Sequence, residues 1–290
     1  MNRKIFLFFV VLLFTSLNIA AEDGKKTGWQ LELKTAALDL TSTQVKHSDT
    51  YQEFPDAKLN ADSQTLIQGR MHLEGDYFGQ NYLWANSVFM EYGKTTVKPE
   101  NGEKVTTENA DKILVSTDYT LRLWSVQDFL GGFEAGPFVS VAYETEFNST
   151  GNTPLKKIVR GSAGAKLFEG KYLKSLFAAG FMEYDFTYPE DAVKYGYEAG
   201  LSLEYLIREG VKAKFSALFR DYCYSTKKQP TDLDYSLELD ARMDVLVLKN
   251  LAVAPFINYY TAQGKYVGPR GENLYIGVSF SFSHVFVAAK

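Results

Sequence analysis

The sequence is poor in cysteine and histidine, and neither sign of charge is in marked excess. It contains one Cys and three His among 290 residues. A single Cys excludes an intramolecular disulfide and a cysteine zinc site. The 31 Lys and Arg against 35 Asp and Glu give a net charge of −4. This mild acidity argues against a nucleic-acid binder, which usually carries a basic face.

Long apolar runs are also scarce. After residue 21 the sequence has no run of 18 apolar residues, so we expect no transmembrane helix. The run at residues 5–14 follows Arg3 and Lys4 and precedes the small residues Ala20 and Ala21. This order is typical of a secretory signal, although a retained membrane anchor is the alternative. We predict a cleaved signal peptide over 1–21 and a single domain over 22–290.

Aromatic residues are abundant, at 15 % of the chain, and apolar residues alternate with polar ones. Residues 235–245 show the pattern most clearly, and 67–77 and 195–205 repeat it. A period of two predicts β-strands with one apolar and one polar face. We find about twelve such segments: 28–40, 64–79, 81–97, 112–124, 132–146, 157–169, 174–187, 193–207, 210–224, 233–247, 250–263 and 272–286.

Two of these segments are irregular. The first changes its alternation near Ala36 and Ala37, which predicts a β-bulge. In 81–97, Asn86 interrupts the apolar face.

The connections between the segments alternate in length. Every second one is long and polar, at 41–63, 98–111, 147–156, 188–192, 225–232 and 264–271, whereas most of the others are short. In an up-and-down sheet, alternate connections lie at opposite ends, and long loops at one end are typical of outer-membrane barrels. We therefore predict an all-β fold, a transmembrane antiparallel up-and-down β-barrel of about 12 strands. A secreted soluble β-barrel or sandwich is the alternative.

The aromatic residues indicate which face meets lipid. Many lie near segment ends, as in the two girdles of a membrane barrel: Trp29, Tyr77, Tyr92, Tyr143, Phe186, Tyr188, Tyr195, Tyr205, Tyr235 and Tyr259. The segment 272–286 ends with aromatic residues, like the terminal strand that barrel-assembly machinery recognises. The expected location is the cell outer membrane, with outer-membrane lipid and this machinery as partners.

One stretch resembles a known group of proteins. Trp84, Asn86, Ser87, Tyr92 and Gly93, followed by Asp111, Lys112, Ser116 and Tyr119, are similar to a pattern in an uncharacterised family of bacterial outer-membrane β-barrels. The resemblance spans residues 82–123. It implies the location and the fold, and it brings no catalytic or ligand-binding residues. It also suggests that Asn86 lies at a bulge or register change.

The polar face carries the candidate functional residues. Acidic, basic and acidic side chains follow one another on three neighbouring segments, so opposite charges can face each other across the sheet. We predict a small-solute or ion channel with a charged lumen. The candidate pore-lining residues are Arg70, His72, Glu74, Glu198, Glu204, Lys212, Lys214, Arg220, Glu238, Asp240, Arg242 and Asp244.

Two other functions stay open. The charges could fill a closed structural barrel that acts through outer loops such as 41–63 and 98–111. A lipid-modifying hydrolase would need His72 with a cross-strand serine such as Ser87 or Ser116. Hydrolytic barrels pair a His with a Ser two residues later, and here that residue is Glu74. We therefore expect no enzymatic activity, and the sequence has no motif for a metal or another cofactor.

Overall fold

The computed structural model describes residues 26–290, apart from residues 55, 61–64, 98–104, 128 and 150–153. The predicted signal peptide over 1–21 lies outside the described residues. Within them, no helix is long and apolar enough to cross a membrane.

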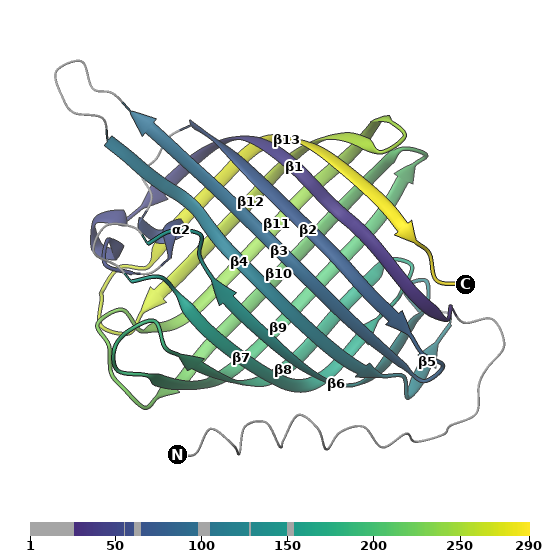
Figure 1. Ribbon diagram of the computed structural model, residues 1–290, viewed down its shortest axis with the longest axis horizontal. Coiled ribbons are helices and arrows are strands. Elements are labelled where there is room, and N and C mark those ends of the chain that lie inside the picture. The colour runs from purple at the N-terminus through teal and green to yellow at the C-terminus, as the bar shows by residue number, and fades with distance from the viewer. Residues whose placement is uncertain (1–25, 55, 61–64, 98–104, 128, 150–153) are drawn as a thin grey trace.

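Thirteen antiparallel strands of the described residues form one sheet, which curls into a barrel (Figure 1). The strands are β1 (Gly28–Lys46), β2 (Thr65–Phe78), β3 (Tyr82–Val97), β4 (Val105–Leu121), β5 (Trp124–Val126), β6 (Phe133–Thr145), β7 (Lys157–Phe168), β8 (Leu173–Asp185), β9 (Ala192–Arg208), β10 (Val211–Ser225), β11 (Leu233–Leu248), β12 (Leu251–Gly264) and β13 (Gly271–Val287).

The barrel closes through two sets of strand pairs. β1 pairs with β13, and β4 pairs with β6. The short β5 pairs with β6 beyond the end of β4, so it extends the β4 side of the wall. The closed wall therefore has twelve strands in up-and-down order, as the alternation predicts.

Two strands extend six or seven residues beyond the ends that the sequence predicts. β1 continues to Lys46 instead of residue 40, and β4 begins at Val105 instead of residue 112. Thr41 and Thr43 are buried on the inward face of β1. Polar residues on both faces hide the period of two at this end of the wall, so the pattern underestimates the length of the strand.

The β-bulge in β1 is confirmed two residues earlier than predicted. The register to β2 shifts between Leu33 and Thr35. Lys34 contacts the inward Glu74, and Thr35 lines an interior cavity. The bulge therefore turns two consecutive side chains inward.

Asn86 lies at no bulge, contrary to the expectation, because the β2–β3 register is unbroken around it. Its amide donates to the carbonyl oxygen of Gly75 (2.9 Å) and accepts from the Thr117 hydroxyl (2.9 Å). These bonds satisfy a polar side chain on the apolar face, so the strand needs no irregularity there.

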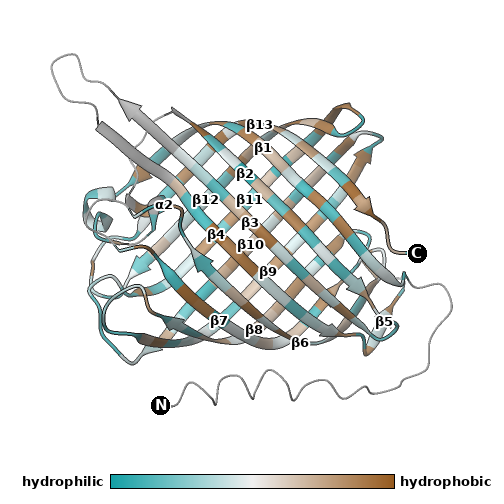
Figure 2. Cartoon of the chain, in the orientation of Figure 1, coloured by the Kyte–Doolittle hydropathy of each residue, from teal (hydrophilic) through white to brown (hydrophobic). Residues whose placement is uncertain are grey.

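The outer surface is apolar with aromatic groups towards both ends. Apolar and polar residues alternate along the strands (Figure 2). Near the short turns, Trp29 contacts Tyr77 and Trp84 with ring centroids 5.3 and 5.7 Å apart. Near the long connections, Tyr195 contacts Tyr224. An exposed apolar band between two aromatic girdles is the surface of a transmembrane β-barrel.

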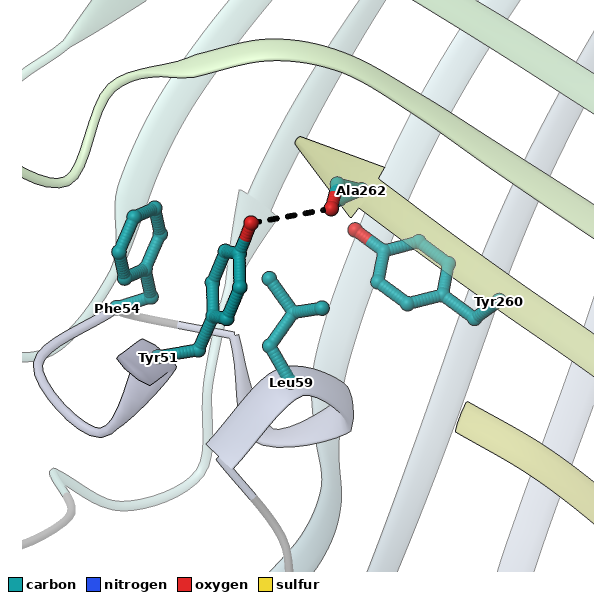
Figure 3. Packing of buried hydrophobic residues seen from close by; sticks show 5 residues of the cluster. All are labelled: Tyr51, Phe54, Leu59, Tyr260 and Ala262. Carbon is teal, nitrogen blue, oxygen red and sulfur yellow. Dashed lines mark hydrogen bonds between the residues drawn. The ribbon is translucent and has the colours of Figure 1, made fainter. Parts of the chain in front are cut away.

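The connection from β1 to β2 is folded, although its sequence predicts a polar loop. It contains the 3₁₀ helix η1 (Ser48–Tyr51) and the short helix α2 (Ala57–Asn60). Tyr51, Phe54 and Leu59 are buried and pack on the inner face of β12 (Figure 3). This connection therefore occupies one end of the barrel, opposite the end of the chain at Lys290 (Figure 1).

Substitutions at two glycines of β7 test how closely the strands of the wall pack. A Cβ at Gly164 would overlap the carbonyl oxygen of Ala178 on β8, whereas a Cβ at Gly161 would meet nothing within 4 Å. We expect Gly164→Ala to lower the free energy of unfolding by about 1–3 kcal/mol, the usual cost of overpacking. Gly161→Ala is the matched control and should cost nothing. Urea unfolding in detergent micelles measures both, and equal stabilities would contradict the packing.

Candidate functional site

The charged residues predicted on β9, β10 and β11 lie on the inward face, and several of them pair across the sheet. Arg220 lies opposite Glu198, with Nε 2.8 Å from Oε2. Two further pairs are diagonal across neighbouring strands: Lys212 contacts Glu204 (3.0 Å) and Lys214 contacts Asp244 (2.7 Å). Arg242 contacts Asp244 (2.6 Å) along the same strand, β11.

The remaining predicted residues also lie inside. Arg70 Nε is 2.5 Å from Asp39 Oδ2, and His72 Nε2 is 3.3 Å from Glu74 Oε1. Asp240 lines the larger interior cavity beside Arg70 and His72. That these twelve residues line a pore stays a prediction.

A second charged group lies nearer the long connections, and the sequence prediction missed it. Arg160 Nη2 contacts Glu183 Oε2 (2.6 Å), and Lys194 Nζ contacts Asp185 (3.0 Å). Glu144 pairs with Lys156 at 2.6 Å. The signal for Glu144, Arg160 and Glu183 was present, because all three occupy polar positions in segments predicted as strands.

The sequence pattern does not reveal that Lys58 of α2 lies inside the barrel, because its position depends on how the first connection folds. Its Nζ lies 2.7 Å from Glu238 Oε1 and 3.5 Å from Glu91 Oε1. Burial alone would lower the pKa of Lys58, but Glu238 and Glu91 outweigh burial and raise it well above the usual value. Lys58 is therefore a cation that ties the first connection to two strands of the wall.

A smaller and a larger cavity are lined by described residues of the interior. One of about 110 Å³ lies near the long connections and is lined by Asp56, Lys156 and Thr231 among others. The second, of about 340 Å³, lies deeper and is lined by residues such as Arg70, His72 and Asp240. Four residues line both cavities, and we call them the constriction: Lys58, Glu91, Lys112 and Glu238.

The residues considered for hydrolysis contact other partners. Ser87 and Ser116 share a hydrogen bond of 2.8 Å. His72 contacts Glu74 and meets the Phe89 ring edge-on at 6.0 Å. In the described part of the chain, no hydrogen bond joins His72 to a serine, and no group of three His, Cys, Asp or Glu side chains is placed to hold a metal ion.

The comparisons with known proteins concern the fold. No family model and no curated protein matches the sequence. The solved structures similar to the chain include the translocator domain of the autotransporter NalP from Neisseria meningitidis, at 11 % identity and a TM-score of 0.36. That match covers 90 % of this chain and 90 % of the other.

Two further similar structures are a phospholipase and a channel. Outer membrane phospholipase A from Escherichia coli matches at 12 % identity and a TM-score of 0.44, over 85 % of this chain and 90 % of that one. An outer membrane channel from Pseudomonas putida matches at 9 % identity and a TM-score of 0.46, over 92 % and 100 %. The fold that the resemblance implies, an antiparallel β-barrel, is confirmed by the closed wall of twelve strands described above.

The Arg160–Glu183 pair is almost fully buried, with side chains 6 % and 2 % exposed. Removal of one buried partner leaves the other charge uncompensated, so Arg160→Ala should lower the free energy of unfolding by about 3–5 kcal/mol. The double variant Arg160→Met with Glu183→Leu should lose less, because no charge is stranded. Urea unfolding measures both variants. Lys227→Ala, which breaks the exposed pair with Glu190, is the control, and an equal loss there would contradict the argument.

Glu146, just after β6, should make stability depend on pH. Burial raises its pKa, Asp111 and Asp56 add to the effect, and Lys156 opposes it, with a result of about 7 against the ordinary 4.5. Between these values the folded state binds more protons than the unfolded state, so stability should fall as the pH rises from 4.5 to 7. Glu146→Gln should remove this decline in unfolding measured at pH 5 and pH 8. An identical decline in the variant would exclude Glu146 as its source.

Proposed function

We propose that the chain is an outer-membrane channel for small polar solutes or ions and carries no catalytic activity of its own. One observation supports this most directly: two cavities with charged linings follow one another inside the barrel and meet at the constriction. Charged side chains in a water-filled barrel select among solutes by sign and size.

The constriction combines both signs of charge. Glu91 and Glu238 contribute carboxylates, while Lys58 and Lys112 contribute ammonium groups. Lys58 comes from the first connection and not from the wall, so the width of the passage depends on where this connection rests. A movement of α2 away from Glu238 would join the two cavities.

The same contacts favour a second candidate, a closed structural barrel. Lys58 holds the first connection inside by two ion pairs, and Tyr51 adds hydrogen bonds to the carbonyl oxygens of Pro269 (2.9 Å) and Ala262 (3.3 Å). If these contacts never break, the barrel acts through its outer loops alone. A lipid-modifying hydrolase is the third candidate, and the contacts of His72 with Glu74 and of Ser87 with Ser116 speak against it.

Two variants of opposite charge test the constriction in planar bilayers. Lys58→Gln removes a positive charge and should shift selectivity towards cations, whereas Glu238→Gln should shift it towards anions. Each shift should be about tenfold in the cation-to-anion permeability ratio, because a unit charge roughly 6 Å from an ion in water is worth ~0.7 kcal/mol and acts with opposite sign on the two ions. Reversal potentials in a salt gradient measure both shifts.

The control is Lys46→Gln, which removes a rim charge whose side chain is 70 % exposed and should leave selectivity unchanged. A folded barrel, identified by heat-modifiable gel migration, that gives no discrete current would overturn the channel and favour the closed barrel. Currents with the same selectivity in both constriction variants would place the ion path elsewhere.

A further inference from the structure

The larger cavity has the size and charge balance of a small-molecule site. Its volume of about 340 Å³ falls in the range of ligand pockets, ~300–1,000 Å³. Its lining is balanced between acidic and basic side chains: Asp39, Glu91, Glu238 and Asp240 against Lys58, Arg70, Lys112 and Arg242. A lining of this kind favours neither a simple cation nor a simple anion.

One wall of this cavity presents two acceptors. Asp240 on β11 and Asn258 on β12 are register partners. The Nδ2 of Asn258 donates to Glu238 (3.2 Å), which leaves its buried Oδ1 without a hydrogen-bond partner. Among the described residues, no cation lies within ion-pair distance of Asp240. A carboxylate beside a free amide oxygen suits an ammonium group.

Another part of the lining presents donors. Arg70, Glu91 and Lys112 form one row across β2, β3 and β4. Arg70 touches Asp39 through Nε, but its buried Nη2 has no hydrogen-bond partner. Lys112 forms no ion pair with the described residues. A guanidinium nitrogen and an ammonium group in the same cavity suit a carboxylate.

Apolar surface completes the cavity. Phe89 and Phe256 both line it, and the Arg70 guanidinium lies over the Phe256 ring at 5.2 Å from its centroid. This contact joins β2 to β12 across β1 and β13, which lie between them in the sheet. We propose that the larger cavity binds a small zwitterion of the α-amino-acid class, with its ammonium group at Asp240 and Asn258 and its carboxylate at Arg70 and Lys112. The proposal rests on the proposed function, because it names the solute class of the channel.

Three matched probes test this solute class. L-alanine carries both charges, propionate lacks the ammonium group, and ethylamine lacks the carboxylate. Calorimetric titration of the refolded barrel in detergent micelles should show alanine binding about tenfold more tightly than either analogue, the effect of one lost charged contact. This comparison uses the unaltered protein, so it does not depend on how a variant folds.

Two variants test which residue binds the ammonium group of the probe and which binds its carboxylate. Asp240→Asn should weaken alanine and ethylamine about tenfold and spare propionate, and Lys112→Gln should weaken alanine and propionate and spare ethylamine. Asp118→Asn is the matched control, because Asp118 pairs with Lys166 at 3.1 Å and does not line this cavity. Its alanine affinity should equal that of the unaltered protein.

The outcomes separate this proposal from the channel function. Equal affinity for all three probes, or no binding of alanine, would overturn the zwitterion site even if the barrel conducts ions. Selective alanine binding by a barrel that gives no current would support the site and overturn the channel. Selective binding together with block of the ion current by alanine would support both.

Discussion

Lipid offers the peptide backbone no hydrogen-bond partner, and the rest of this structure follows from that constraint. Each strand must pair on both sides, so the sheet must close, here through β1 with β13 and β4 with β6. Closure sends alternate side chains into a confined interior. An isolated charge there would lose its hydration, so acids and bases meet across neighbouring strands, as Arg220 meets Glu198.

The ion pairs that stabilise the wall also take up the space within it. In a barrel of twelve strands, inward side chains fill part of the cross-section and leave separate cavities. The first connection adds Tyr51, Phe54 and Lys58 to this filling from one end. The wall and the cavities therefore share residues, so a change in one ion pair alters both the stability of the barrel and the shape of its interior.

The sequence predicts the wall far better than what lies inside it. Strict alternation reveals the strands because their two faces meet different environments, and it fails in 41–46, where both faces are polar. The inward positions of Glu198, Arg220 and Asp244 follow from the same alternation. The position of Lys58 does not, because it depends on tertiary packing of α2 against Tyr260, more than 200 residues away. At Asn86 the sequence suggests a bulge that is absent. The alternation cannot show that this polar side chain forms hydrogen bonds to both neighbouring strands.

The pairing of β1 with β13 has a kinetic consequence. The two strands lie more than 200 residues apart in sequence but share register from Leu31 opposite Val287 to Lys46 opposite Glu272. Contacts of such separation carry a large entropic cost and form late in folding. Until they form, both strands expose unpaired edges that attract other chains. The nascent barrel is therefore most prone to aggregation just before closure, and a chaperone that shields the edge of β13 would protect it at that stage.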